Sequence, residues 1–136
     1  MLTFVWNVRV YWEDTDAGGV VYHARYLHFF ERARTEWLRS LGVQQAKMAE
    51  QDNRIFTILN MNIDFVQAAR LDDELAVSVH SAQAGGARMT FDQSIDRRAD
   101  GQLIAKTNVT AACLRADKFK PTRIPEWIRT EINHAK

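Results

Sequence analysis

The sequence predicts one α+β domain in which helices pack on one face of an antiparallel β-sheet. The first observation is length, because 136 residues fit a single domain over positions 1–136, with no linker or internal repeat. The second is the order of the hydrophobic patterns, which run from a first strand to a long helix and then to four strands. The third is that short turns join the later strands, which is typical of antiparallel connections.

Positions 4–13 are rich in valine and aromatic residues, which favours a first strand. Residues 14–19 then have the composition of a turn. Over 24–41 the apolar residues recur at i, i+3, i+4 and i+7, which predicts a long amphipathic helix that Gly42 ends. A short helix over 44–50 follows.

The second half of the chain is predicted to form strands. Residues 59–65 alternate apolar and polar side chains with a period of two, and similar runs occupy 75–80 and 89–95. A last, longer strand covers 103–114, and 125–132 form a closing helix with proline at its first turn. Because one long helix cannot cover both faces of a five-stranded sheet, we expect a homo-oligomer.

Composition and charge exclude several classes of protein. Hydrophobic residues make up 46% and charged residues 26%, which excludes a disordered tail, a collagen-like chain and a disulfide scaffold. The net charge of +1 argues against a nucleic-acid partner. No apolar run reaches the roughly 18–20 residues of a membrane span, and the N-terminal residues lack the features of a signal peptide. We therefore expect a cytoplasmic protein.

The residue types also argue against metal and thiol chemistry. Cys113 is the single cysteine and lies in an apolar run, so we interpret it as a core residue rather than a reactive thiol. The four histidines lack the spacing of zinc ligands. The sequence therefore predicts no metal site.

The segment from Glu13 to Tyr26 has the strongest chemical signal, because it places two carboxylates, Asp14 and Asp16, and His23 between a strand and a helix. Unpaired N–H groups at a helix start can bind an oxyanion or a carbonyl oxygen. A carboxylate there can act as a general base or a nucleophile. The structural alternatives are a helix cap or turn for the aspartates and a surface position for His23.

A long motif carries a resemblance to a known family. Residues 8–26 read VRVYWEDTDAGGVVYHARY, which resembles the active-site signature of the 4-hydroxybenzoyl-CoA thioesterase family. Residues 29–36, FFERARTE, are similar to the subgroup of Tol-Pal system-associated acyl-CoA thioesterases. The segments 64–73 and 118–125 also resemble the family's strand-loop-strand and C-terminal Lys/Arg-Pro regions.

The resemblance implies a hotdog fold, in which a five-stranded antiparallel sheet wraps around a long central helix and subunits form homodimers or homotetramers. It implies hydrolysis of an acyl-CoA thioester to a free acid and CoA without a cofactor, at a site on the dimer interface. Asp16 matches the catalytic aspartate, as a base or a nucleophile. His23 matches the histidine of the subgroup, and the N–H groups near His23 and Ala24 would polarise the carbonyl.

The residues expected to contact substrate fall into two groups. Those around the catalytic pair are Gly19, Tyr22, Ala24 and Tyr26, of which Tyr26 is assigned mainly to helix packing. Those expected to contact the CoA phosphates are the basic residues Arg88, Lys118, Lys120 and Arg123. The alternative for the cluster at 118–123 is a solvated loop without a ligand.

Two other functions stay open at this point. A hotdog dehydratase or hydratase would act on similar thioesters, although the Asp16 signature argues against it. A non-catalytic acyl-thioester binding or scaffold subunit, docked to acyl carrier protein, would not need Asp16 and His23. The subgroup suggests a short- to medium-chain aliphatic acyl group, with longer chains and acyl carrier protein thioesters as alternatives.

Overall fold

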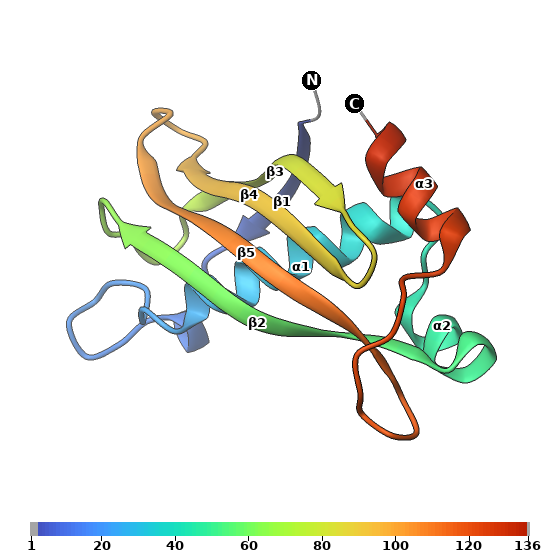
Figure 1. The fold of residues 1–136 in the computed structure, drawn as a ribbon. Coiled ribbons are helices and arrows are strands. Elements are labelled where there is room, and N and C mark those ends of the chain that lie inside the picture. Colours follow the sequence, from blue (N-terminus) through green and yellow to red (C-terminus); the bar gives the residue numbers. More distant parts are fainter. Residues whose placement is uncertain (1–2, 136) are drawn as a thin grey trace.

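The computed structural model describes residues 3–135, which form one five-stranded antiparallel sheet with helices packed on it (Figure 1). The elements in chain order are β1 (Phe4–Arg9), the 3-10 helix η1 (Trp12–Asp14), α1 (Arg25–Ser40), α2 (Gln45–Asp52), β2 (Arg54–Phe65), β3 (Glu74–Ala84), β4 (Arg88–Arg97), β5 (Leu103–Arg115) and α3 (Glu126–His134). The predicted strand–helix–four-strand order is confirmed.

The strand order in the sheet is β1-β3-β4-β5-β2, and every neighbouring pair is antiparallel. The first two strands in the chain therefore lie at opposite edges, since α1 separates them in sequence and crosses the sheet between them. Among the described residues, no strand pairs with the outer edge of β2. An open edge of this kind can accept another strand.

The core lies between α1 and the inner face of the sheet. Phe29, Phe30 and Ala33 on α1 are fully buried, and the ring of Trp37 meets that of Phe91 edge-on at 5.8 Å between centroids. The partners on β3 and β4 alternate along each strand, as the period of two requires: Leu75, Val77, Val79, Met89, Phe91 and Ile95. Cys113 is also fully buried in this core, which confirms its interpretation as a core residue.

Two predicted boundaries and one predicted alternation were wrong because non-local pairing decides them. The first strand ends at Arg9 rather than near position 13, since Val10 exchanges backbone hydrogen bonds with the 72–73 turn and η1 follows. The strand expected over 59–65 begins at Arg54, because β5 is long enough to pair with it up to Arg115, the last residue of β5. A bulge between Ile58 and Asn60 leaves Leu59 half exposed, so the alternation starts at Met61.

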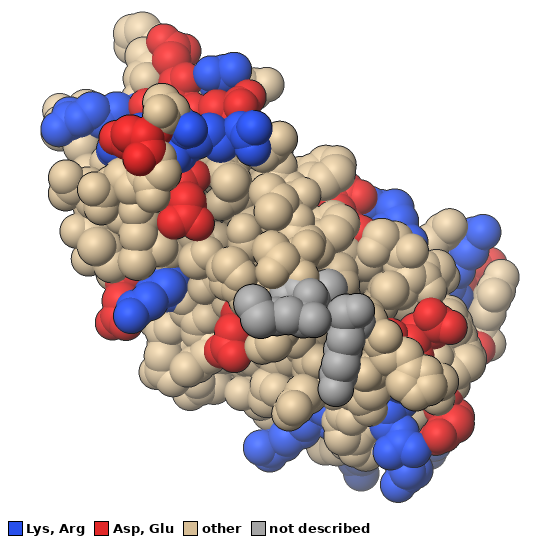
Figure 2. Space-filling model, turned by 90° about the horizontal axis from the view of Figure 1, so that it is seen from above, with Lys and Arg blue, Asp and Glu red and all other residues tan. Residues whose placement is uncertain are grey.

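Within residues 3–135, no helix is long and apolar enough to cross a membrane. On the face drawn in Figure 2, basic and acidic side chains lie side by side, most densely at one end, and most of the surface between the two ends is uncharged where described residues form it. The charges on this face therefore do not separate into a basic surface of the kind that nucleic acids require.

Candidate active site

The residues of the sequence motif form a compact loop between η1 and α1. The backbone N–H of Asp16 donates to the carbonyl of Val20 at 2.9 Å, and the N–H of Gly19 donates to the carbonyl of Asp16 at 3.0 Å. Gly19 has a φ of +79°, a left-handed conformation that glycine adopts without the cost a side chain adds. The pattern predicted at the sequence level, two glycines after an aspartate pair, therefore builds a tight turn.

The Asp16 side chain is exposed and only half engaged. Its Oδ1 accepts the N–H of Gly18 at 2.8 Å, so the turn alternative for this aspartate is realised. Within the described part of the chain, its Oδ2 has no hydrogen-bond partner. One carboxylate oxygen is therefore held in place while the other stays free for chemistry.

For Asp14, the structure supports the local role that was the alternative to catalysis. It is almost fully buried, its Oδ2 accepts the N–H of Tyr11 at 2.8 Å, and its Oδ1 lies 3.5 Å from Nε of Arg25. Its carbonyl accepts the N–H of Tyr22 at 2.9 Å. Asp14 thus ties the start of the loop to the first turn of α1.

The start of α1 presents two free backbone donors. No side chain caps this helix, whose first turn begins with the N–H of Arg25 bonded to the carbonyl of Tyr22. Across residues 3–135, neither the N–H of His23 nor that of Ala24 donates a hydrogen bond. Both donors lie at the positive end of the helix dipole, where a polarised carbonyl oxygen is stabilised.

A cleft of about 280 Å³ opens beside these donors. Its walls come from the motif loop, α1, the end of β2 and the segment after it, and the lining residues are Val21, His23, Tyr26, Phe65, Val66, Gln67 and Ala68. The His23 ring lies 4.5 Å from the Tyr22 ring and 6.4 Å from the Phe65 ring, measured between centroids. The cleft is therefore largely apolar, and the His23 imidazole is part of its lining.

Tyr26 is a packing residue, as the sequence analysis assigned it. Its side chain is buried against the rings of Phe29 and Phe65, and its hydroxyl oxygen accepts the N–H of Ala69 at 3.1 Å. Burial raises the pKa of this hydroxyl, and the charges of Asp73 and Asp16 add to the rise.

The cleft includes residues that the sequence analysis did not single out. Val21 donates its N–H to the carbonyl of Ala69 at 2.9 Å, and Val20 forms an isolated bridge with Arg70, so the 66–73 segment lies against the motif loop. The available signal was the exposed apolar pair Phe65 and Val66 at the end of a strand. Their contact with the motif could be found only from the folded structure, since more than 40 positions separate them from it in the sequence.

The four basic residues lie elsewhere in the chain's fold. Lys118, Lys120 and Arg123 are exposed on the loop after β5, and Arg88 begins β4 beside the same end of the sheet. This loop contacts the start of β2, whereas His23 contacts Phe65 at its other end. The two ends are separated by the twelve residues of β2, which span about 35 Å when extended. Within one chain, these basic residues therefore do not lie in the same site as Asp16 and His23.

No group of three or more potential metal ligands is found among residues 3–135. Gly19 and Tyr22 are exposed around the loop, and Ala24 lies at the start of a second groove of about 340 Å³ between α1 and β2. The residues predicted to surround the catalytic pair are therefore gathered at one end of the molecule.

Comparison with known proteins agrees with this geometry. A family model described as the thioesterase-like superfamily matches residues 10–132. The chain is 44% identical over 133 residues to the acyl-CoA thioesterase YbgC of Haemophilus influenzae, covering 98% of this chain and 96% of that protein.

Two solved structures are also similar. A probable thioesterase from Bartonella henselae is 35% identical with a TM-score of 0.84, covering 91% of this chain and 100% of that one. A 1,4-dihydroxy-2-naphthoyl-CoA thioesterase from Synechocystis is 27% identical with a TM-score of 0.89, covering 97% and 96% of the two chains. These similarities confirm the hotdog fold, and the chain belongs to the thioesterase-like superfamily.

Proposed function

We propose that this protein is an acyl-CoA thioester hydrolase that releases a free acid and CoA. The observation that carries the proposal is the pair of unbonded N–H groups of His23 and Ala24, next to an apolar cleft and in the same loop as the half-free carboxylate of Asp16. The identity of 44% to an acyl-CoA thioesterase along almost the whole chain supports it.

The chemistry follows from the groups present. The thioester oxygen accepts hydrogen bonds from the N–H groups of His23 and Ala24, which stabilise the negative charge that develops on it. Asp16 either removes a proton from an attacking water or attacks the carbonyl itself to form a mixed anhydride that water then cleaves. In both routes the C–S bond breaks and the CoA thiolate leaves and takes up a proton. His23 orients the thioester or assists this proton transfer.

The acyl group occupies the cleft of about 280 Å³ beside Phe65 and Val66. Its size and apolar walls favour a short- to medium-chain aliphatic group over a long chain, which would need the neighbouring α1–β2 groove as well. The Synechocystis relative carries an aromatic acyl group in its name, so an aromatic acyl-CoA belongs in any substrate panel.

The active unit is proposed to be a homodimer, with a homotetramer as its further assembly. The outer edge of β2 is open, and Ile58, Leu59 and Phe65 along this strand are 43–53% exposed. Antiparallel pairing of β2 with β2 of a second copy would bury this apolar edge. It would also bring the second copy's 116–123 loop to the Phe65 end of this chain, where the second copy's Lys118, Lys120 and Arg123 could meet the CoA phosphates.

The test measures thiol release from acyl-CoAs of two to sixteen carbons and from benzoyl-CoA, with Asp16→Asn beside the wild type. We expect Asp16→Asn to lower kcat about 100-fold or more, because a base or nucleophile is lost. Asp52→Asn, an exposed carboxylate at the end of α2, is the matched control and should keep the wild-type rate. Wild-type rates from Asp16→Asn would remove Asp16 from the mechanism.

Mixing two inactive variants tests the shared site. One variant carries Asp16→Asn, and the other carries Lys118→Glu, Lys120→Glu and Arg123→Glu. If the site combines Asp16 of one copy with the basic loop of the other, random mixing restores about a quarter of the wild-type sites. If both groups come from one chain, mixing restores nothing.

Two finer points complete the proposal. We place the protein in the cytoplasm, where a single buried thiol such as Cys113 stays reduced. Acyl carrier protein thioesters are the second substrate candidates, and the same panel on that carrier distinguishes them. Binding of acyl-CoA without turnover would instead favour the scaffold alternative, and hydration of an enoyl-CoA would favour a hydratase.

A further inference from the structure

The 66–73 segment forms one wall of the candidate site although it lies outside the sequence motif. Val66, Gln67 and Ala68 line the cleft, and the carbonyl of Ala69 accepts the N–H of Val21, two residues before His23. A shift of this segment would therefore move the cleft wall and the motif loop together.

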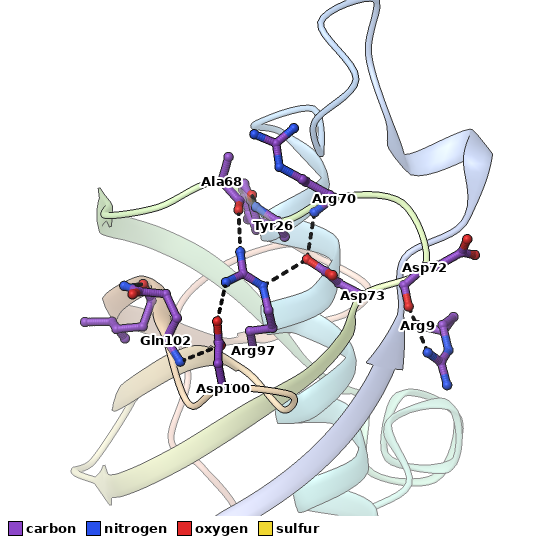
Figure 3. Close-up of polar contacts among 11 residues, drawn as sticks. Arg9, Tyr26, Ala68, Arg70, Asp72, Asp73, Arg97, Asp100 and Gln102 are labelled. Atoms are coloured by element: carbon purple, nitrogen blue, oxygen red, sulfur yellow. Dashed lines mark hydrogen bonds and ion pairs between the residues drawn. The ribbon is translucent and has the colours of Figure 1, made fainter.

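One guanidinium group holds this segment against the end of the sheet. This group belongs to Arg97, the last residue of β4. Its Nη2 donates to the carbonyl of Ala68 at 2.9 Å, and its Nε donates to Oδ2 of Asp73 at 3.1 Å. Its Nη1 donates to Oδ2 of Asp100 at 3.0 Å. The three nitrogens thus reach three different segments, as Figure 3 shows.

The partners of Arg97 are themselves held in place. Oδ2 of Asp73 also accepts the N–H of Arg70 at 2.9 Å, which closes the turn at the end of the segment. Oδ1 of Asp100 accepts the N–H of Gln102 at 3.0 Å. The side chains of Arg97 and Asp73 are 18% and 23% exposed, so water screens this contact less than it screens a surface ion pair.

We propose that Arg97 is a positioning residue for the thioesterase site, an inference that rests on the proposed function. It touches no reacting atom; it fixes Ala68 and, through Ala69, the backbone of Val21 that leads to His23. Only arginine has a planar fork with donors for three acceptors, because the lysine ammonium is a point charge on a flexible stem. Catalytic rates fall steeply when reacting groups are displaced by about 1 Å.

The test compares Arg97→Gln with Arg98→Gln in the acyl-CoA assay. Arg98 is the adjacent residue and pairs with Glu74 at 2.9 Å and Asn7 at 3.2 Å, so its loss removes the same charge without releasing Ala68. We expect Arg97→Gln to lower kcat about tenfold or more with KM within about twofold of wild type. Arg98→Gln should change both by less than about twofold. Arg97→Lys should stay well below wild type although it keeps the charge.

A second readout makes the inference independent of the activity. Hydrogen exchange at the amides of Ala69 and Val21 should become about tenfold faster in Arg97→Gln and stay unchanged in Arg98→Gln. If the wild type hydrolyses no acyl-CoA, the proposed function fails and the exchange data alone decide the inference. Wild-type kcat or unchanged exchange in Arg97→Gln would overturn it, as would equal losses of kcat in the two glutamine variants. If Arg97→Gln does not fold, Arg97→Lys is judged by the same criteria.

Discussion

The single hydrogen bond between Tyr26 and Ala69 offers a sharp test of how the cleft is held. Tyr26→Phe removes one oxygen and keeps the ring that packs on Phe29 and Phe65. The N–H of Ala69, a fully buried residue, would lose its acceptor. A buried donor without a partner costs about 1–3 kcal/mol, so we expect that loss in the free energy of unfolding. In a domain of this size, each kcal/mol corresponds to about 4 °C in Tm.

The pH dependence gives the same test an internal control. The pKa of Tyr26 is raised in the folded protein, whereas an unfolded tyrosine ionises near its ordinary pKa of 10.0. The stability that comes from keeping Tyr26 neutral is therefore complete below pH 10 and is lost as the pH rises above 10 toward the folded pKa. Tyr26→Phe lacks this ionisation, so the stability gap between the two proteins should narrow above pH 10.

Urea denaturation at pH 8 and pH 11 measures both effects. The other tyrosines, Tyr11 and Tyr22, are present in both proteins, so their ionisation cancels in the comparison. A gap below about 0.5 kcal/mol at pH 8 would mean that the Ala69 N–H finds water or another acceptor, and would refute the reasoning. A gap that stays constant up to pH 11 would refute the assignment of the raised pKa to burial of Tyr26.

Three further changes separate catalysis from stability. His23→Ala should lower kcat by less than Asp16→Asn does, because its proposed role is to orient or assist; an equal loss in the thiol-release assay would assign it a central role. Asp14→Asn should lower the free energy of unfolding by about 1–2 kcal/mol, since the buried charge opposite Arg25 is lost, and an unchanged urea midpoint would contradict this. Ile128→Ala in α3 should lower the free energy of unfolding by about 2–5 kcal/mol, because it leaves a cavity in the core. The kcat of the folded protein should stay the same, because α3 packs on β3 away from the cleft, and a lower kcat at saturating substrate would show coupling to the site.

The helices and strands whose apolar residues repeat with one regular period were predictable from the sequence. The helix expected over 24–41 is observed as Arg25–Ser40, because one face of it must be buried and its apolar residues repeat accordingly. The start of β2 was missed, since Arg54 to Ile58 do not alternate and are ordered by pairing with β5. Such pairing depends on residues about 60 positions away and on backbone groups that every residue carries.

The same distinction applies to the candidate site. The turn with Asp16 and Gly19 could be predicted because a tight turn at a helix start needs particular residue types within a few positions, and the resemblance of the 8–26 motif to a known family singled out Asp16 and His23 as the catalytic pair. Ala68 and Ala69 could not, since they act through a carbonyl and an N–H that have no residue signature. Arg97 looked like any other charged residue of a turn, because its three acceptors come together only in the folded chain.

The sequence by itself determined the α+β class, the burial of α1 and the position of the turn that carries Asp16, because each depends on short-range periodicity or local backbone conformation. Only the tertiary structure decided which groups share a cleft. It placed Lys118 and Lys120 near one end of β2 and His23 near the other, and an extended strand of this length is about 35 Å long. It also placed Arg97 against Ala68, 29 positions away, because antiparallel pairing puts the last residue of β4 beside the start of β3 and the segment before it.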